Sequence, residues 1–176
     1  MPSTSNRFLL LLGAALVLAC NEQAPDDVLG PGPDVVTAAR DATPQLVACP
    51  STESRSVSKT IGILGGSLEI DGTRVVVPVG AVLLPTTITL TLPASPYMEV
   101  DFTANSLQHF KFPVAVHVTI DYSRCDRRAL AARPVTAWYI DTPTKNLLEL
   151  MRAKDDRAAR RVSFPTIHFS GYSIAQ

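Results

Sequence analysis

Two segments alternate between apolar and polar residues at every second position, and this alternation constrains the fold most. In Thr87–Leu92 the apolar residues fall on one face and the threonines on the other. Val114–Ile120 repeats the pattern with valines and an isoleucine. A period of two is typical of a β-strand with one buried face. The predicted core residues of the second segment are Val114, Val116, Val118 and Ile120, and its predicted outward residues are Ala115, His117, Thr119 and Asp121.

Shorter segments of the same kind fill most of the remaining chain after residue 46. Strands are predicted at Ser58–Ile63, Leu68–Ile70, Arg74–Val77, Val135–Ile140, Leu147–Met151, Arg161–Phe164, Thr166–Ser170 and Tyr172–Ala175. Gly, Pro and Asp residues separate them, as in a chain of tight turns. One short helix is predicted at Asp126–Ala132, because alanines favour a helix and Pro134 would end it. Residues 46–176 are therefore predicted to form a single antiparallel β-sandwich.

The N-terminal residues have the pattern of an export signal. A polar start with one positive charge, Arg7, precedes twelve apolar residues, Phe8–Ala19, which are too few to span a bilayer as a helix. Because Cys20 follows Ala19 directly, the segment resembles the lipobox of bacterial lipoproteins. That resemblance implies that residues 1–19 are removed, that the Cys20 thiol receives a diacylglycerol, and that the new amine is acylated. An ordinary cleaved signal with a coincidental cysteine is the alternative.

Residues 20–45 are predicted to be the lipidated cysteine followed by a disordered tether. Prolines recur in this stretch, and residues 21–45 hold five acidic residues against one arginine. Few large apolar residues are available to bury. A coil of this length has a root-mean-square reach of ~25–30 Å. Asn21 stands where many inner-membrane lipoproteins have aspartate, so the resemblance implies an outer-membrane location in a bacterium with two membranes.

Charge and cysteine content narrow the remaining function classes. Residues 46–176 carry 14 basic and 11 acidic residues, which is too balanced for a nucleic-acid-binding surface. Cys49 and Cys125 form an even pair that an oxidising compartment would allow to bridge, and two separate buried thiols are the equal alternative. No ligand spacing typical of a metal site is present, and neither a metal nor a cofactor is predicted.

Several short motifs recur in the order of a known domain family. They are a Gly-Gly turn and strand at 65–70, a strand with a Pro-x-Gly-Ala corner at 75–82, the alternating strand at 86–92, a Phe-Pro-Val strand entry at 112–114, a closing hairpin at 137–150, and a final His-Phe-Ser-x-Tyr run at 168–172. Residues 57–176 thus resemble the zonula-occludens and uncoordinated-five domain (ZU-five domain), as found in bacterial lipoproteins. The resemblance implies a non-enzymatic interaction or scaffold module of the cell envelope, with an envelope protein or polysaccharide as its partner.

The His168-Phe169-Ser170 run offers an enzymatic alternative. In autoproteolytic relatives of this family the serine hydroxyl attacks the carbonyl carbon of the preceding phenylalanine, the histidine acts as base, and the ester is hydrolysed. Strand alternation places His168 and Ser170 on one face, opposite Ile167 and Phe169. The other interpretation is a closing strand with Phe169 in the core and the two polar residues outward. Cleavage would release only seven residues, Ser170–Gln176, which favours the closing strand.

Other candidate contacts are two basic groups and one aromatic pair. The first basic group is Arg124, Arg127, Arg128 and Arg133, and the second is Arg152, Lys154, Arg157, Arg160 and Arg161. Either would attract anionic lipid or polysaccharide, although charged runs on turns are usually solvated surface. Trp138 and Tyr139 point to opposite faces of one strand, so at most one lies in the core.

Overall fold

The computed structural model describes residues 43–128, 130 and 133–176. The chain divides into two units, Met1–Asp41 and Ala42–Gln176, and every described residue belongs to the second. The predicted signal, Cys20 and all but the last residues of the predicted tether lie outside the described part. The described part contains strands and turns and no helix.

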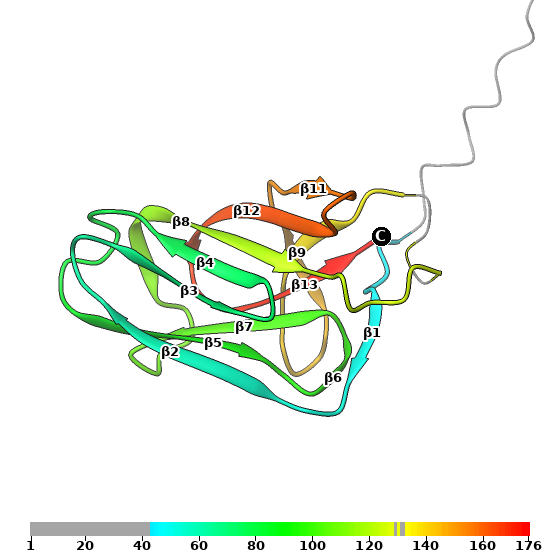
Figure 1. Cartoon of the computed structure of the whole chain (residues 1–176), viewed down its shortest axis with the longest axis horizontal. Helices are drawn as coiled ribbons and strands as arrows, with labels where there is room; N and C mark the ends of the chain where they lie inside the picture. Colours follow the sequence, from blue (N-terminus) through cyan, green and yellow to red (C-terminus); the bar gives the residue numbers. More distant parts are fainter. Residues whose placement is uncertain (1–42, 129, 131–132) are drawn as a thin grey trace, which may run out of the picture. The chain divides into compact units, whose positions relative to one another are not determined.

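Two antiparallel sheets face each other (Figure 1). The larger sheet has the strand order β10-β9-β13-β7-β5-β2. Its strands are β2 (Arg55–Ile61), β5 (Thr86–Leu92), β7 (Glu99–Ala104), β9 (Thr136–Ile140), β10 (Leu147–Leu150) and β13 (Gly171–Ala175). The smaller sheet has the order β11-β12-β8-β4-β3 and consists of β3 (Gly66–Ile70), β4 (Thr73–Val77), β8 (Lys111–Asp121), β11 (Lys154–Asp156) and β12 (Arg161–His168). The predicted all-β antiparallel sandwich is confirmed.

The core lies between the two sheets and is built by the alternation that the sequence predicted. Along β5, Ile88, Leu90 and Leu92 are buried. Aromatic rings fill the centre: Phe102 stacks on Phe169 at 5.1 Å between ring centroids. Each aromatic side chain buries roughly 150–250 Å². The largest fully buried side chains include Tyr172, Phe102, Phe164 and Phe169.

The start of the described chain pairs with a mid-chain strand and with the end of the chain. A two-stranded sheet pairs β1 (Ala48–Ser51) with β6 (Ser95–Tyr97). Residues before β1 also bond to the end of β13: the Gln45 amide donates to the Gln176 carbonyl at 2.8 Å, and the Gln176 amide donates to the Gln45 carbonyl at 3.0 Å. The folded unit therefore begins and ends at the same place.

Several predictions for single residues were wrong. Val114 is exposed, because the register between β8 and β12 shifts near its position and the outward and inward sides no longer alternate there. Asp121 is buried, and hydrogen bonds from Ser123 and Arg161 offset the cost of burying its carboxylate. The predicted helix at 126–132 is replaced, in its described residues, by a turn with a bond from the Leu130 amide to the Arg127 carbonyl.

The strand prediction also differs from the structure near Pro165. The two strands predicted on either side of this residue are one continuous strand, β12, which ends at His168. Proline is tolerated in a strand where its missing N–H would face an edge. The pairing of β12 with β11 covers only Arg161–Ser163, so Pro165 lies on an edge that β11 does not cover. The strands β1, β6, β7 and β11 were not predicted.

Candidate functional site: an arginine-lined pocket

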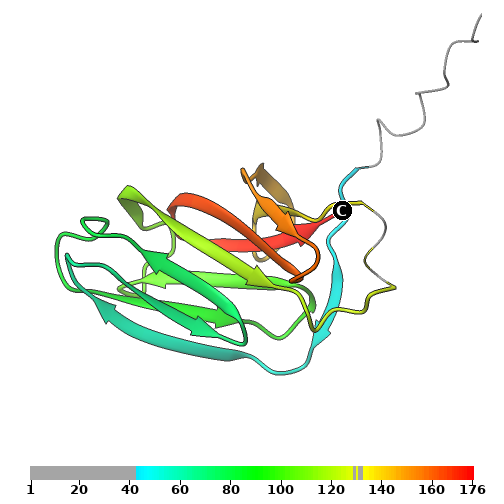
Figure 2. The same ribbon diagram turned by 45° about the horizontal axis from the view of Figure 1, so that its top comes forward.

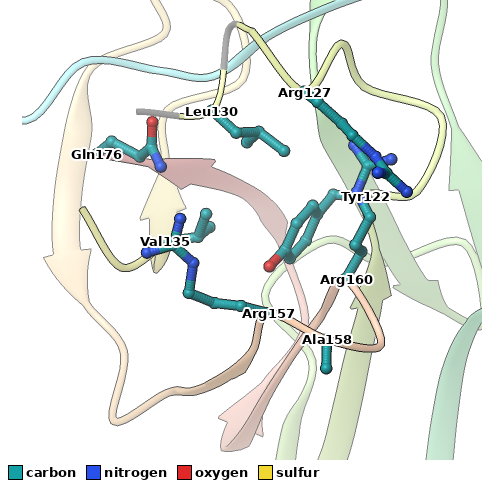
Figure 3. Close-up of a pocket in the computed structure, with 8 residues that line it drawn as sticks. All are labelled: Tyr122, Arg127, Leu130, Val135, Arg157, Ala158, Arg160 and Gln176. Atoms are coloured by element: carbon teal, nitrogen blue, oxygen red, sulfur yellow. The ribbon is translucent and has the colours of Figure 1, made fainter. Parts of the chain in front are cut away.

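A pocket of about 340 Å³ opens beside the chain terminus. Its eight described lining residues are Tyr122, Arg127, Leu130, Val135, Arg157, Ala158, Arg160 and Gln176. Figure 3 shows the Tyr122 ring in the middle, with Arg157 on one side and Arg127 and Arg160 on the other. None of these eight residues is acidic. The lining therefore places three arginines around one tyrosine.

The pocket forms where two distant connections meet. One is the long connection from β8 to β9, which supplies Tyr122 and Arg127. The other is the tight turn between β11 and β12, which supplies Arg157 and Arg160. The Tyr122 amide donates to the Arg160 carbonyl at 2.9 Å, which holds the two connections together. Sequence reasoning found both basic groups but could not place them in one pocket.

Arg160 fixes the wall of the pocket. Its guanidinium donates to the Ser123 carbonyl at 2.6 Å and to the Cys125 carbonyl, and it lies 5.9 Å from the centroid of the Tyr122 ring. A guanidinium has five N–H donors in a planar fork, so two backbone contacts leave further donor capacity. Arg160 thus organises the connection and still adds positive charge to the pocket.

A disulfide also holds the β8–β9 connection. Cys49 of β1 is bonded to Cys125, and their Cα atoms are 4.8 Å apart, within the range for a bridge. Arg124 donates to the Cys49 carbonyl at 3.1 Å, next to the bridge. The pairing that the sequence left open is thus present in the structure, where it ties the pocket to the first strand.

Asp155 holds two of the lining residues by hydrogen bonds. It accepts a 2.6 Å hydrogen bond from the Tyr122 hydroxyl and a 2.9 Å bond from the Val135 amide. Burial and the hydrogen bond to Asp155 both raise the pKa of the Tyr122 phenol, so this group stays neutral. The carboxylate of Asp155 is therefore engaged by two lining residues, Tyr122 and Val135. A lining with three arginines suits a carboxylate, sulfate or phosphate group, which arginine binds through paired N–H donors.

The other members of the two basic groups have different roles. Arg161 donates to Asp121 at 3.0 Å on the smaller sheet. Arg124 bonds backbone carbonyls beside the disulfide. Arg128 is exposed and does not line the pocket. Of the nine basic residues in the two groups, the pocket lining therefore includes Arg127, Arg157 and Arg160.

The predicted cleavage run lies at a crossing between the sheets. His168 ends β12, and the chain then passes through Phe169 and Ser170 to begin β13 in the opposite sheet. Phe169 is in the core as predicted, but Ser170 is buried rather than outward, and Ile167 is exposed rather than in the core. His168 and Ser170 therefore do not share one strand face, because the strand ends between them.

The His168 side chain contacts groups other than the serine. Its Nδ1 lies 3.2 Å from the Tyr172 hydroxyl, and its Nε2 lies 4.0 Å from the Glu149 carboxylate. The Tyr172 hydroxyl also donates to the His168 carbonyl at 2.5 Å and lies 2.9 Å from the Thr166 hydroxyl. Burial lowers the pKa of the His168 imidazole, although Glu149 acts in the opposite direction. Within the described chain, no hydrogen bond joins the His168 ring to the Ser170 hydroxyl. These contacts fix the crossing between β12 and β13.

The remaining candidates have structural contacts. Tyr139 packs against the core, with its ring 5.1 Å from that of His168, whereas Trp138 donates to the Thr136 hydroxyl at 3.0 Å. Tyr139 is thus the inward member of the aromatic pair. His117 is exposed, as predicted.

A pair of carboxylates on β7 was not predicted as a cluster. Glu99 is buried and pairs with Lys145 at 2.7 Å. Asp101 lies two residues further along the strand, and burial, together with the negative charge of Glu99, raises its pKa. Across the described residues, no group of three or more His, Cys, Asp or Glu side chains is placed to hold a metal ion.

No protein-family model matches the chain, and no curated protein matches its sequence. Within the part that the structure describes, no helix is long and apolar enough to cross a membrane.

Proposed function

We propose that this chain is a lipid-anchored, non-enzymatic interaction module of the bacterial cell envelope. The lipobox-like sequence around Cys20 supports the anchor, and the ZU-five-like motifs within 57–176 support an interaction role. The β-sandwich is the fold expected of such a module. An outer-membrane location is part of the proposal and rests on Asn21.

The arginine-lined pocket is the observation that carries the proposal. Three arginines on two connections surround one tyrosine, and none of the lining residues is acidic. The disulfide, Arg160 and Asp155 hold these connections in place before any ligand arrives. A preformed site loses less conformational entropy on binding than a flexible one. We therefore propose that the pocket binds an anionic group of an envelope polysaccharide or protein.

The pocket is tested by titrating the chain with a soluble polyuronate, a polymer with one carboxylate per sugar. Arg127→Ala is the informative variant, because the Arg127 side chain lines the pocket while Arg160 also supports the fold. We expect roughly tenfold weaker binding, the effect of losing one charge-assisted contact. Arg128→Ala is the matched control: the neighbouring arginine lies outside the lining, and binding should change less than twofold.

Two results would contradict the pocket assignment. One is equal weakening by Arg127→Ala and Arg128→Ala, which would indicate unspecific attraction by surface charge. The other is no binding of the polyuronate and none of inorganic phosphate, which would leave the arginines without an anionic ligand.

The anchor is tested separately by Cys20→Ser. A serine hydroxyl cannot form the thioether to diacylglycerol, so the variant should lose its acyl chains and leave the membrane fraction. Metabolic labelling with a fatty acid and fractionation measure the two effects. A variant that stays labelled and sediments with membranes as the parent does would show that the anchor assignment is wrong.

A further inference from the structure

One end of the sandwich exposes large aliphatic side chains on loops. Leu64 is 82% exposed, and Leu83 and Leu84 are 72% and 75% exposed. Ile63, Val79 and Leu107 are also mostly exposed. Single exposed aliphatic residues are ordinary, but a contiguous group at one end marks an interaction site. We call these six residues the apolar tip.

The six residues come from three connections between the sheets that lie side by side. They are the β2–β3 turn, the β4–β5 loop and the β7–β8 loop. The Gly80 amide donates to the Ile63 carbonyl at 2.9 Å, which joins the first two. The Asn105 amide donates to the Thr87 carbonyl at 2.8 Å, which brings the third to the end of the second. Figures 1 and 2 both place the β2–β3 and β4–β5 connections at the end away from the C-terminus.

The β4–β5 loop presents its largest side chains to solvent and buries its smaller ones. Ala81 and Val82 are buried in the core, whereas the following Leu83 and Leu84 are not. The loop is thus fixed to the sandwich by the two buried residues. Its leucines extend outward from a fixed backbone. Folding itself therefore does not fix the conformations of their side chains.

Charge favours an anionic partner at this end. Segments 59–66, 77–88 and 103–112 make up the tip and the strand ends beside it, and they contain no acidic residue. They contain Lys59, Lys111 and His109, and both lysines are exposed. Aliphatic side chains on protruding loops, flanked by lysines, match the boundary between acyl chains and anionic headgroups.

We infer that the apolar tip docks on an anionic lipid surface, with Leu64, Leu83 and Leu84 entering the boundary between headgroups and acyl chains. The length of chain before the fold permits this in the membrane that holds the proposed anchor. Residues 21–42, if extended, span up to ~75 Å, whereas β8, the longest strand with 11 residues, spans ~36 Å. The tip can therefore reach the bilayer while Cys20 stays in it. Only this reach rests on the proposed anchor, and the docking itself does not.

Vesicle co-sedimentation of the chain from residue 20 onward, carrying Cys20→Ser, tests the inference without any acyl chain. This chain contains the whole compact unit Ala42–Gln176. The probe is vesicles of phosphatidylethanolamine with phosphatidylglycerol, and neutral phosphatidylcholine vesicles are compared with them. We expect binding to the anionic vesicles. Leu64→Ser with Leu83→Ser should weaken this binding by roughly tenfold or more, because the variant lacks two leucines that the inference places in the membrane.

Leu148→Ser with Leu150→Ser is the matched control. These leucines are 52% and 54% exposed on β10 and lie outside the tip, so vesicle binding should not change. Thermal unfolding of both double variants should match the parent, which excludes misfolding as the cause of any loss. Arg127→Ala separates the two sites: docking through the tip predicts a smaller loss of vesicle binding in Arg127→Ala than in Leu64→Ser with Leu83→Ser.

Four outcomes would overturn the inference. They are no binding of the parent to anionic vesicles, equal loss in the two double-leucine variants, greater loss in Arg127→Ala than in the tip variant, and a parent dimer that Leu64→Ser with Leu83→Ser dissociates. The third would place lipid phosphate in the arginine pocket, and the fourth would place a second copy of the chain on the tip. None of them bears on whether Cys20 is acylated.

Discussion

The arginine-lined pocket and the apolar tip expose opposite kinds of chemistry on one sandwich. The pocket presents three guanidinium groups, and its walls are held by a disulfide and by hydrogen bonds to backbone carbonyls. The tip has no charge among its six residues and is held by turns and by two small buried residues. One region is thus supported by polar and covalent contacts, and the other by backbone conformation and apolar packing.

This difference shows how a β-sandwich separates binding from folding. The strands of both sheets bury the same kind of alternating aliphatic face, so they provide stability without selecting a partner. Specific chemistry is carried by the connections, which lie at the surface and can change without disturbing the core. Substitutions in the connections around the pocket should therefore affect stability differently from substitutions in the connections at the tip.

The largest expected effect is on the pocket side, from removing the disulfide. Cys49→Ala with Cys125→Ala should lower the free energy of unfolding by about 4 kcal/mol, because the bridge closes a loop of 76 residues in the unfolded chain. Chemical denaturation measures the change. Mass spectrometry without reductant provides the control, and two freely alkylated thiols in the parent would show that the bridge is absent. Equal stability of parent and variant would contradict its structural role.

A smaller effect is expected at the tip from two glycines in the left-handed region. Gly65 has φ of 74°, and a Cβ there would lie 2.3 Å from the Val77 carbonyl oxygen. Gly80 has φ of 78°, but a Cβ there meets nothing within 4 Å. Gly65→Ala should cost about 2–3 kcal/mol of stability and Gly80→Ala only about 1 kcal/mol. Thermal or chemical unfolding checks the order, and a larger loss for Gly80→Ala would contradict it.

The sequence predicted the strands of the sandwich better than it predicted the arginine-lined pocket or the apolar tip. The alternation in Thr87–Leu92 identified a strand and its buried face, because period-two patterning reports burial directly. The strand β7 was missed because Glu99 and Asp101 interrupt the apolar pattern, and only the structure shows Lys145 pairing with Glu99. The strands β1 and β6 were not predicted because they are short and each contains a proline.

The pocket could be predicted only in part. The sequence identifies its arginines as members of two separate basic groups. Local sequence patterns do not predict which connections lie next to each other in the fold. Arg127 and Arg157 come together because β8, β11 and β12 are neighbours in one sheet. The tip was missed because its leucines lie between predicted strands and resemble core residues in composition. Exposure of Leu83 beside buried Val82 depends on the path of the loop, which the sequence does not state.

A still smaller effect is expected on the pH dependence of stability, from the carboxylate of Asp121 beside the pocket. Burial would raise the pKa of Asp121, but hydrogen bonds from Ser123 and the ion pair with Arg161 outweigh it, so the pKa is lowered. A lowered pKa stabilises the fold at neutral pH, and this contribution is lost as pH falls below about 4. Asp121→Asn should therefore cost about 1 kcal/mol at neutral pH and progressively less in acid.

Unfolding curves of parent and Asp121→Asn at several pH values measure this effect. The tip provides the comparison, because its loops contain no carboxylate. The difference between parent and Gly80→Ala should stay constant over the same pH range. A pH-independent deficit in Asp121→Asn would show that the ionised carboxylate does not stabilise the fold.

The smallest expected effect is at Ser170. Intact masses of the parent and of Ser170→Ala should differ by one oxygen atom only, because the His168 ring contacts Tyr172 and Glu149 rather than the serine. A parent that lacks Ser170–Gln176, while Ser170→Ala retains these residues, would establish cleavage after Phe169. Ser170→Cys should then cleave as well, since a thiol can perform the same attack.

The two ends of this sandwich are proposed to bind different partners. The most direct measurement follows the backbone amide resonances of the isotope-labelled chain carrying Cys20→Ser, titrated with polyuronate and, separately, with anionic lipid nanodiscs. We predict that polyuronate shifts the resonances around Tyr122, Arg127 and Arg160, and that nanodiscs broaden those of Leu64, Leu83 and Leu84. Perturbation of the same end by both partners, or of neither end by either, would contradict this proposal.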